Sequence, residues 1–143
     1  MISFDEQAIM DNGAYIYAQR AEIERIADEV CSQGFDSIFF TSSGGSLAMM
    51  QPFDYLVSTM SDIPVQSQIS ADLLTVGNRR IGKGTIAFMA SKSGDTKETV
   101  AAAKAVKDAG CTIISTLGVE NSPLGELSDY SCLLYTSPSP RDS

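Results

Sequence analysis

Five of the nine residues in the stretch SKSGDTKET, residues 91–99, are serine, threonine or glycine, and none of the nine carries a bulky apolar side chain. It follows the apolar run TIAFMA, residues 85–90, and precedes an alanine-rich segment. A loop between a buried strand and a helix presents backbone N–H groups and the partial positive charge of the helix N-terminus, and Gly94 would let the backbone approach a ligand closely. Asp95 and Glu98 have the spacing of a capping box, which would fix the loop to the helix. The stretch therefore predicts a site for a small anion such as a phosphate group.

A second loop of the same chemistry, TSSGGS, covers residues 41–46 and follows the apolar run SIFFT, residues 37–41. Ligands of parallel α/β sheets bind outside the carboxyl ends of the strands, so both loops would open on one edge. Neither loop ends in the glycine-lysine-serine/threonine of a Walker loop, and TSSGGSLA lacks the third glycine of a dinucleotide-binding turn. Lys92 lies within its loop, which makes it the better ligand candidate of the nearby lysines. The alternative is that both loops are ordinary strand-to-helix connections that bind nothing.

Apolar periodicity divides the rest of the chain into alternating strands and helices. The expected strands are residues 37–41, 65–69, 85–90 and 111–116. The expected helices are residues 22–30, 47–60, 71–76 and 96–109, with a short helix that Ser122 caps and Pro123 begins. Pro52 predicts that the second of these helices starts late or kinks. This alternation predicts an α/β fold of three layers, with a doubly wound, mostly parallel sheet covered by helices on both faces.

Composition excludes several classes of protein. The chain has 143 residues, 10 of them basic and 18 acidic, and its formal net charge of −8 argues against a nucleic-acid partner. No apolar run is long enough to span a membrane, and the N-terminus lacks the order of a signal peptide. The sequence has no histidine, and its three cysteines lack metal-ligand spacing, which excludes histidine-dependent nucleophiles and most zinc sites. We expect a cytoplasmic protein without a metal, a membrane partner or a nucleic-acid partner.

Residues 91–99 resemble the signature of the SIS (sugar isomerase) domain family, which reads small-Ser-x-Ser-Gly-(Glu/Asp)-Thr-x-(Glu/Asp)-Thr after a buried strand. The segment Gly44-Gly45-Ser46 is similar to the first loop of the family, and residues 121–124 are similar to its serine-leucine turn. The resemblance covers residues 35–131. It implies a flavodoxin-like, three-layer fold and a phosphosugar site that uses no metal or organic cofactor.

The resemblance also implies the residues of the site. The substrate phosphate would be bound by hydroxyl groups and by the loop backbone at Ser46, Ser91, Lys92, Ser93, Gly94 and Thr96. Supporting loop residues would be Gly44, Gly45 and Asp95. Catalytic residues stay unassigned, because in double-domain relatives the acid/base carboxylate and the histidine or lysine lie mainly in the second domain or at its boundary. The acidic residues Glu98, Glu120 and Glu126 are expected on helix surfaces or at caps.

Three parts of the chain are expected. Residues 1–34 would form a helical leader, residues 35–131 the SIS domain, and residues 132–143 a tail. The leader resembles that of double-domain members, so the domain is expected to be the first of two, with the second missing. Residues 132–142, CLLYTSPSPRD, correspond codon by codon to one reading frame of a sequencing-library adapter. We therefore interpret the tail as non-native, with the natural sequence ending at about Ser131.

The function implied by the resemblance is phosphosugar binding, in the N-terminal part of a sugar-phosphate isomerase or deglycase. The branch that fits best is that of the deglycases acting on fructoselysine- or glucoselysine-6-phosphate, whose substrate is an aminated ketose 6-phosphate. Two alternatives stay open: a non-catalytic phosphosugar-sensing module, and the isomerase part of glucosamine-6-phosphate synthase. The partner expected is a small sugar phosphate, and the full-length protein is expected to be a homo-oligomer. Because no catalytic pair is evident, this part of the protein is expected to lack the full catalytic set.

Overall fold

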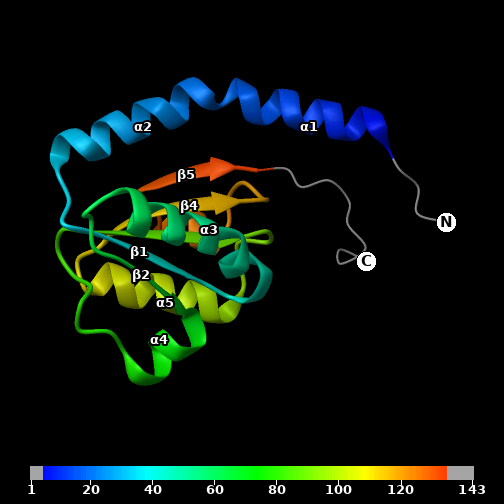
Figure 1. Ribbon diagram of the computed structural model, residues 1–143. Helices are drawn as coiled ribbons and strands as arrows, with labels where there is room; N and C mark the ends of the chain where they lie inside the picture. Colours follow the sequence, from blue (N-terminus) through cyan, green and yellow to red (C-terminus); the bar gives the residue numbers. More distant parts are fainter. Residues whose placement is uncertain (1–4, 135–143) are drawn as a thin grey trace.

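The protein folds as an α/β domain around a parallel sheet, as the sequence predicts (Figure 1). The computed structural model describes residues 5–134. Within them, the 5-stranded sheet has the order β2-β1-β3-β4-β5, and every neighbouring pair is parallel. The strands are β1 (Ser37–Ser42), β2 (Val65–Ile69), β3 (Thr85–Ser91), β4 (Thr112–Leu117) and β5 (Tyr130–Leu133).

Helices cover both faces of the sheet, which gives the predicted three layers (Figure 1). The helices are α1 (Glu6–Ala18), α2 (Arg20–Gln33), α3 (Gly44–Met60), α4 (Ser70–Val76), α5 (Lys97–Asp108) and α6 (Pro123–Leu127). Side chains of α4, α5 and α6 share one hydrophobic cluster with one face of the sheet, whereas α2 and α3 pack on the other face. Within residues 5–134, no helix combines the length and the apolar character needed to cross a bilayer.

The two faces of the core are separated by the alternation of side chains along the strands. Phe39 is fully buried and packs with Ala102 and Val106 of α5, whereas Phe40 packs with Leu47 and other residues of α3. Two of the four buried residues of α5, Ala102 and Ala103, are alanines, which present little side-chain bulk to the sheet. The central strand β3 is buried at almost every position, as expected for a strand covered on both faces.

Helix α3 begins earlier than the sequence predicts, and Pro52 does not end it. It begins at Gly44, three residues before the expected start, and it runs through Pro52 to Met60. Proline cannot donate to the carbonyl group four residues earlier, which belongs to Ala48. Both Pro52 and Ala48 are exposed, so water can hydrate this carbonyl group and the helix can continue.

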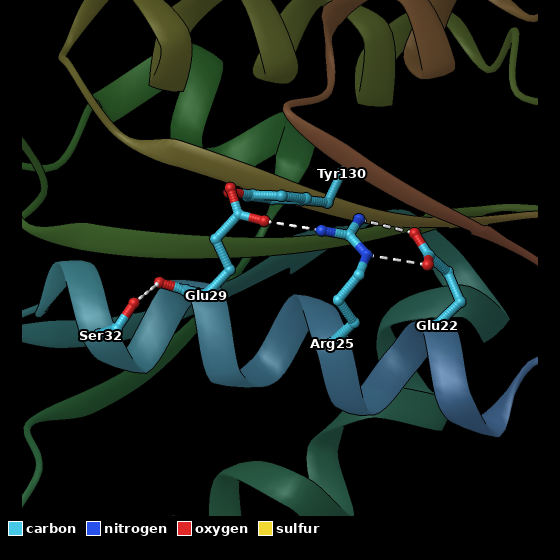
Figure 2. A network of polar contacts seen from close by, with 5 residues as sticks. All are labelled: Glu22, Arg25, Glu29, Ser32 and Tyr130. Atoms are coloured by element: carbon cyan, nitrogen blue, oxygen red, sulfur yellow. Dashed lines mark hydrogen bonds and ion pairs between the residues drawn. The ribbon is translucent and has the colours of Figure 1, made fainter.

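The leader consists of two helices, and only the second packs on the sheet. Ile26 and Val30 of α2 are buried against the sheet. A polar network supports the same contact (Figure 2). In it, Arg25 bridges Glu22 and Glu29 at 2.7 and 2.8 Å, and the Tyr130 hydroxyl of β5 donates to Glu29 at 2.9 Å. The network therefore joins the leader to the edge strand of the sheet.

Strand β5 extends beyond the boundary expected at Ser131. Cys132 and Leu133 pair with β4, so they belong to the sheet, although the sequence assigned them to the tail. Residues 135–143 lie outside the described part of the chain. The interpretation of residues 132–143 as non-native stays a prediction.

Candidate functional site

The candidate site lies where β1 and β3 part. The two strands pair from Ser37 to Phe40, but their backbones no longer pair beyond Phe40. Ser42 bridges the opening, because its Oγ donates to the carbonyl oxygen of Ala90 at 2.6 Å and accepts the N–H of Ala90 at 2.9 Å. After β1 the chain continues into α3 on one face, and after β3 it continues into α5 on the other face. A crevice between such diverging connections is the usual ligand site of a doubly wound sheet.

The N-termini of two helices open on this crevice. The N-cap residues are Ser43 for α3 and Thr96 for α5, and neither side chain caps its own helix. The first amide groups of both helices can therefore serve a ligand, together with the partial positive charge of the helix ends. The hydroxyl groups of Ser43 and Thr99 lie 3.2 Å apart, which ties the two loops to each other.

The loop after β3 is held in shape by its own hydroxyl groups. The buried Oγ of Ser91 accepts the N–H of Gly94 at 2.9 Å and lies 3.2 Å from the Oγ1 of Thr96. Ser91 therefore organises the loop, and its direct contact with a ligand stays a prediction. The capping box expected from Asp95 and Glu98 is wrong, because Thr96 is the N-cap and Glu98 occupies the second helical position instead of the third.

Two glycines of the site allow close contact between neighbouring loops. Gly94 has a φ of 72°, and a Cβ there would lie 2.1 Å from the Oγ of Ser122. Ser122 caps α6 as predicted, accepting the N–H of Gly125, and Leu124 donates to the carbonyl oxygen of Gly94 at 2.9 Å. The loop after β4 thus supports the loop after β3.

The other close contact involves Gly118, directly after β4. Its N–H donates to the carbonyl oxygen of Lys92 at 3.1 Å. A Cβ at Gly118 would lie 2.5 Å from the same oxygen. The side chain of any other residue would therefore push the two loops apart.

A cleft of about 560 Å³ lies among these loops, and it brings four predicted residues together. Its predicted members carry hydroxyl or amino groups and are Ser46, Lys92, Ser93 and Thr96. An adjoining hollow of about 140 Å³ adds Gly45 and Ser91, and Ser46 and Lys92 line it as well. Gly44, Gly94 and Asp95 line neither space, and Gly94 acts through its buried backbone.

The sequence missed other residues that line the cleft. Gly118 and Val119 follow β4 and line it together with Leu134, and Met49 lines the adjoining hollow. The signal that could have identified Gly118 is its position directly after a predicted strand, at the edge where the other loops open.

The chemistry of the cleft suits binding better than proton transfer. Among the described residues that line the cleft and the adjoining hollow, Lys92 is the single ionisable group. Glu98 is exposed on α5, and Glu120 and Glu126 line a separate depression. Residues 5–134 contain no cluster of acidic and cysteine side chains that could hold a metal ion. The arrangement can bind an anion, but it presents no acid/base pair.

Another groove, of about 210 Å³, lies between α2 and the sheet. Aliphatic, aromatic and cysteine side chains line it, among them Ile26, Phe35 and Phe88. Such a lining offers a phosphate neither charge nor strong hydrogen-bond donors, so this groove is not the candidate site.

Comparison with known proteins adds a family model and several relatives. The model of the SIS domain matches residues 34–141. Fructosamine deglycase FrlB of Bacillus subtilis strain 168 is 28% identical over 110 residues, which are 76% of this chain and 34% of that protein. Glutamine–fructose-6-phosphate aminotransferase (isomerizing) of Gluconobacter oxydans is 32% identical over 75 residues, 52% of this chain and 12% of that protein.

An uncharacterized HTH-type transcriptional regulator of Caldanaerobacter subterraneus subsp. tengcongensis is 28% identical over 128 residues, 89% of this chain and 43% of that protein. Among solved structures, one match is a protein of Salmonella typhimurium LT2 that is provisionally named a phosphosugar isomerase. The TM-score is 0.69 and the sequence identity 27%, and the match covers 75% of this chain and 32% of that protein. The chain thus spans less than half the length of these proteins.

Proposed function

The chain belongs to the SIS domain family, and from this premise we propose that its cleft binds the phosphate group of a sugar phosphate. We further propose that the domain is the N-terminal part of a sugar-phosphate isomerase or deglycase acting on an aminated ketose 6-phosphate. The observation that carries the proposal is the convergence of two helix N-termini on one cleft that Ser46, Ser93 and Thr96 line.

Phosphate binding follows from the donors of the cleft. A phosphate ester has three terminal oxygens that accept hydrogen bonds, and helix N-termini with small hydroxyl groups supply donors without bulk. The Lys92 ammonium group adds positive charge in a chain whose net charge is −8. An anionic ligand would therefore be attracted locally although the whole chain repels it.

The substrate class is inferred from the relatives. One is named a fructosamine deglycase and another an isomerizing glutamine–fructose-6-phosphate aminotransferase, so the first name gives an aminated ketose and the second a ketose 6-phosphate with an amino transfer. An aminated ketose 6-phosphate combines this chemistry with the anion site. Since the matched residues are 34% and 12% of those proteins, turnover is assigned to the larger protein, and phosphate binding to this domain.

A second candidate function is phosphosugar sensing without turnover. Two observations favour it: the cleft residues within 5–134 include no carboxylate, and one relative is an HTH-type transcriptional regulator. The two functions share the binding step. They differ in whether the sugar carbons meet an acid/base group, so conversion of the ligand by the whole protein distinguishes them.

Thermal unfolding in the presence of sugars tests the binding step. We expect fructose 6-phosphate to raise the melting temperature more than fructose does, because only the phosphate ester meets the donors of the cleft. Ser93→Ala should reduce the response. Ser32→Ala is the matched control, because Ser32 is exposed on α2 and its hydroxyl donates to the backbone of Glu29 (Figure 2). An equal response to fructose and its phosphate would refute the proposal.

A further inference from the structure

Thr99 is the polar member of the buried side of α5. Its side chain is 1% exposed, and the other buried residues of the helix are Ala102, Ala103 and Val106. Valine has nearly the same shape as threonine, so packing alone does not require a hydroxyl group at this position. A buried hydroxyl group is costly unless it has a hydrogen-bond partner. The partner of Thr99 therefore indicates what its hydroxyl group does.

That partner lies in a distant part of the sequence. The Oγ1 of Thr99 is 3.2 Å from the Oγ of Ser43, in the loop after β1. A helical threonine can instead donate to a carbonyl group of the preceding turn, as Thr59 of α3 does with Tyr55 at 2.7 Å. The contact of Thr99, here called the Ser43–Thr99 pair, joins α5 to the loop that begins α3.

On the side of α3, a tight turn connects Ser43 to the cleft. The N–H of Ser46 donates to the carbonyl oxygen of Ser43 at 3.2 Å, and Ser46 lines the cleft. Gly44 lies in this turn and has a φ of 53°. A Cβ at Gly44 would meet nothing within 4 Å, so the backbone angle favours glycine here, and lack of space does not. The place of Ser43 therefore determines the place of Ser46.

On the side of α5, the first helical turn connects Thr99 to the cleft. Thr96 is the N-cap and Thr99 the third residue of the helix, positions that lie close together in the first turn. Thr96 lines the cleft, and its hydroxyl group lies 3.2 Å from that of the buried Ser91. The Ser43–Thr99 pair thus links a cleft residue of α3, Ser46, to a cleft residue of α5, Thr96.

The backbone pairing of β1 with β3 ends before the cleft. Its last pair includes Phe40, and the two helices that follow pack on opposite faces of the sheet. Ser42 holds the strand ends together through Ala90. The Ser43–Thr99 pair adds a hydrogen bond that holds the start of one helix to the start of the other.

We propose that Thr99 is a positioning residue of the phosphate site, which acts through Ser43 and sets the distance between the first turns of α3 and α5. This role rests on the proposed function, because it concerns how two helix N-termini are directed at one anion. A phosphate group is small, so donors of both helices reach it together only when their separation is correct. With the pair in place, the separation is set before the ligand binds, and the ligand does not have to order the loops.

Amide hydrogen exchange of the ligand-free chain, followed by nuclear magnetic resonance, tests whether the pair holds the loop. Thr99→Val removes the hydroxyl group and keeps the volume, so the Ser46 amide should exchange about fivefold to tenfold faster as its turn loosens. Thr99→Ser keeps the hydroxyl group and should restore slow exchange. The Ser61 amide bonds to Val57 at the other end of α3 and should exchange alike in all variants. Equal exchange of the Ser46 amide in the original chain and in Thr99→Val would overturn the proposal.

Titration calorimetry with inorganic phosphate and with fructose 6-phosphate tests the effect on the site. Thr99→Val should raise both dissociation constants about fivefold to tenfold, and Thr99→Ser should keep them close to those of the original chain. Thr85→Val is the matched control, because it removes a buried threonine hydroxyl from a pair with Ser37 at the other end of the sheet. This control should lower the melting temperature and leave both dissociation constants unchanged. The same pattern in Thr99→Val would indicate a merely structural role and would overturn the proposal.

Coupling between the two residues tests whether Thr99 acts through Ser43. Ser43→Ala should weaken phosphate binding as Thr99→Val does, and the double variant should bind no more weakly than either single variant, because all three lose the same hydrogen bond. Losses that add up in the double variant would contradict the proposal. If the original chain bound neither inorganic phosphate nor fructose 6-phosphate, the proposed function would fail and the positioning role with it. If it bound both and the variants bound equally well, the positioning role alone would fail.

Discussion

The hydroxyl group of Ser42 makes both hydrogen bonds that the backbone of Ala90 would otherwise make with the backbone of β1. The exchange occurs two residues after the last backbone pairing of β1 with β3. It lets the two strands separate while the N–H and the carbonyl group of Ala90 keep a hydrogen-bond partner. The pair lies where β1 and β3 separate, and Ala90 lines the hollow beside the candidate cleft.

Ser42→Ala should destabilise the domain by about 1–3 kcal/mol, because it leaves the N–H and the carbonyl group of Ala90 buried without partners. Urea unfolding followed by circular dichroism measures the loss. Ser37→Ala is the control, because the half-buried Ser37 hydroxyl pairs with Thr85 earlier on the same strand, where backbone pairing with β3 is intact. Similar losses in both variants would show that Ser42 has no special role.

Gly118→Ala should weaken sugar-phosphate binding and lower the free energy of unfolding by about 1–3 kcal/mol, because the new Cβ meets the carbonyl oxygen of Lys92. The loop after β3 would have to move, and with it the donors of the cleft. Gly82→Ala is a matched control, since its Cβ would meet its nearest neighbour, the carbonyl oxygen of Ala109, at an ordinary 3.6 Å. Titration calorimetry and urea unfolding are the measurements. Unchanged binding by the Gly118 variant would contradict the prediction.

Lys92→Met should weaken the binding of fructose 6-phosphate about tenfold, because a charge-assisted contact is lost while most of the side-chain volume is kept. The dependence of the affinity on salt concentration should also become shallower. Lys97→Met provides the comparison, because Lys97 begins α5 and does not line the cleft. Isothermal titration at two salt concentrations measures both effects, and equal losses in the two variants would count against a specific role for Lys92.

Alkaline pH should break the hydrogen bond that joins Tyr130 of β5 to Glu29 of α2. The hydrogen bond from the Tyr130 hydroxyl to Glu29 raises the pKa of Tyr130, because only the neutral phenol can donate it. The pKa of Tyr130 is therefore higher in the folded state than its unfolded-state value of about 10. The hydrogen bond contributes fully to stability below the unfolded-state pKa, and this contribution is lost as pH rises through the folded-state pKa. Urea unfolding between neutral pH and pH ~11 should show the loss.

Two variants identify the source of that pH dependence. Tyr130→Phe removes the titrating group, so stability should fall less steeply above pH ~10 than in the original chain. Glu29→Gln removes the negative charge that accepts the bond, which brings the folded-state pKa of Tyr130 closer to its unfolded value, so the fall should become smaller. An alkaline profile that neither variant alters would show that the pair does not control it.

The sequence was sufficient for β1, β2, β3 and β4, most clearly for the strands that are visible as apolar runs, but it did not predict β5. Residues 37–41 and 85–90 became β1 and β3 with only one residue added to each. Local capping chemistry was equally informative at Ser122, whose side chain caps α6. These features depend on neighbours in sequence, so a single chain reveals them.

Features that depend on tertiary contacts were missed. The early start of α3 at Gly44 contradicts local propensity, since glycine and serine favour helices weakly. Packing of Leu47 and Met50 on the sheet outweighs that preference. Gly118 lies against the carbonyl oxygen of Lys92 because β4 is the neighbour of β3 in the sheet. The sequence around Gly118 does not reveal that contact.

The hydroxyl and amino groups of the cleft come from the connections that follow β1 and β3, the connection after β4 adds Gly118 and Val119, and Leu134 after β5 completes the lining. The proposed phosphate site is therefore formed mainly by loops at one edge of the sheet of this domain. A site of this kind can occur in different proteins while the reaction at the sugar carbons differs between them. The occurrence of similar segments in a deglycase, an aminotransferase and a transcriptional regulator is what this modularity would produce.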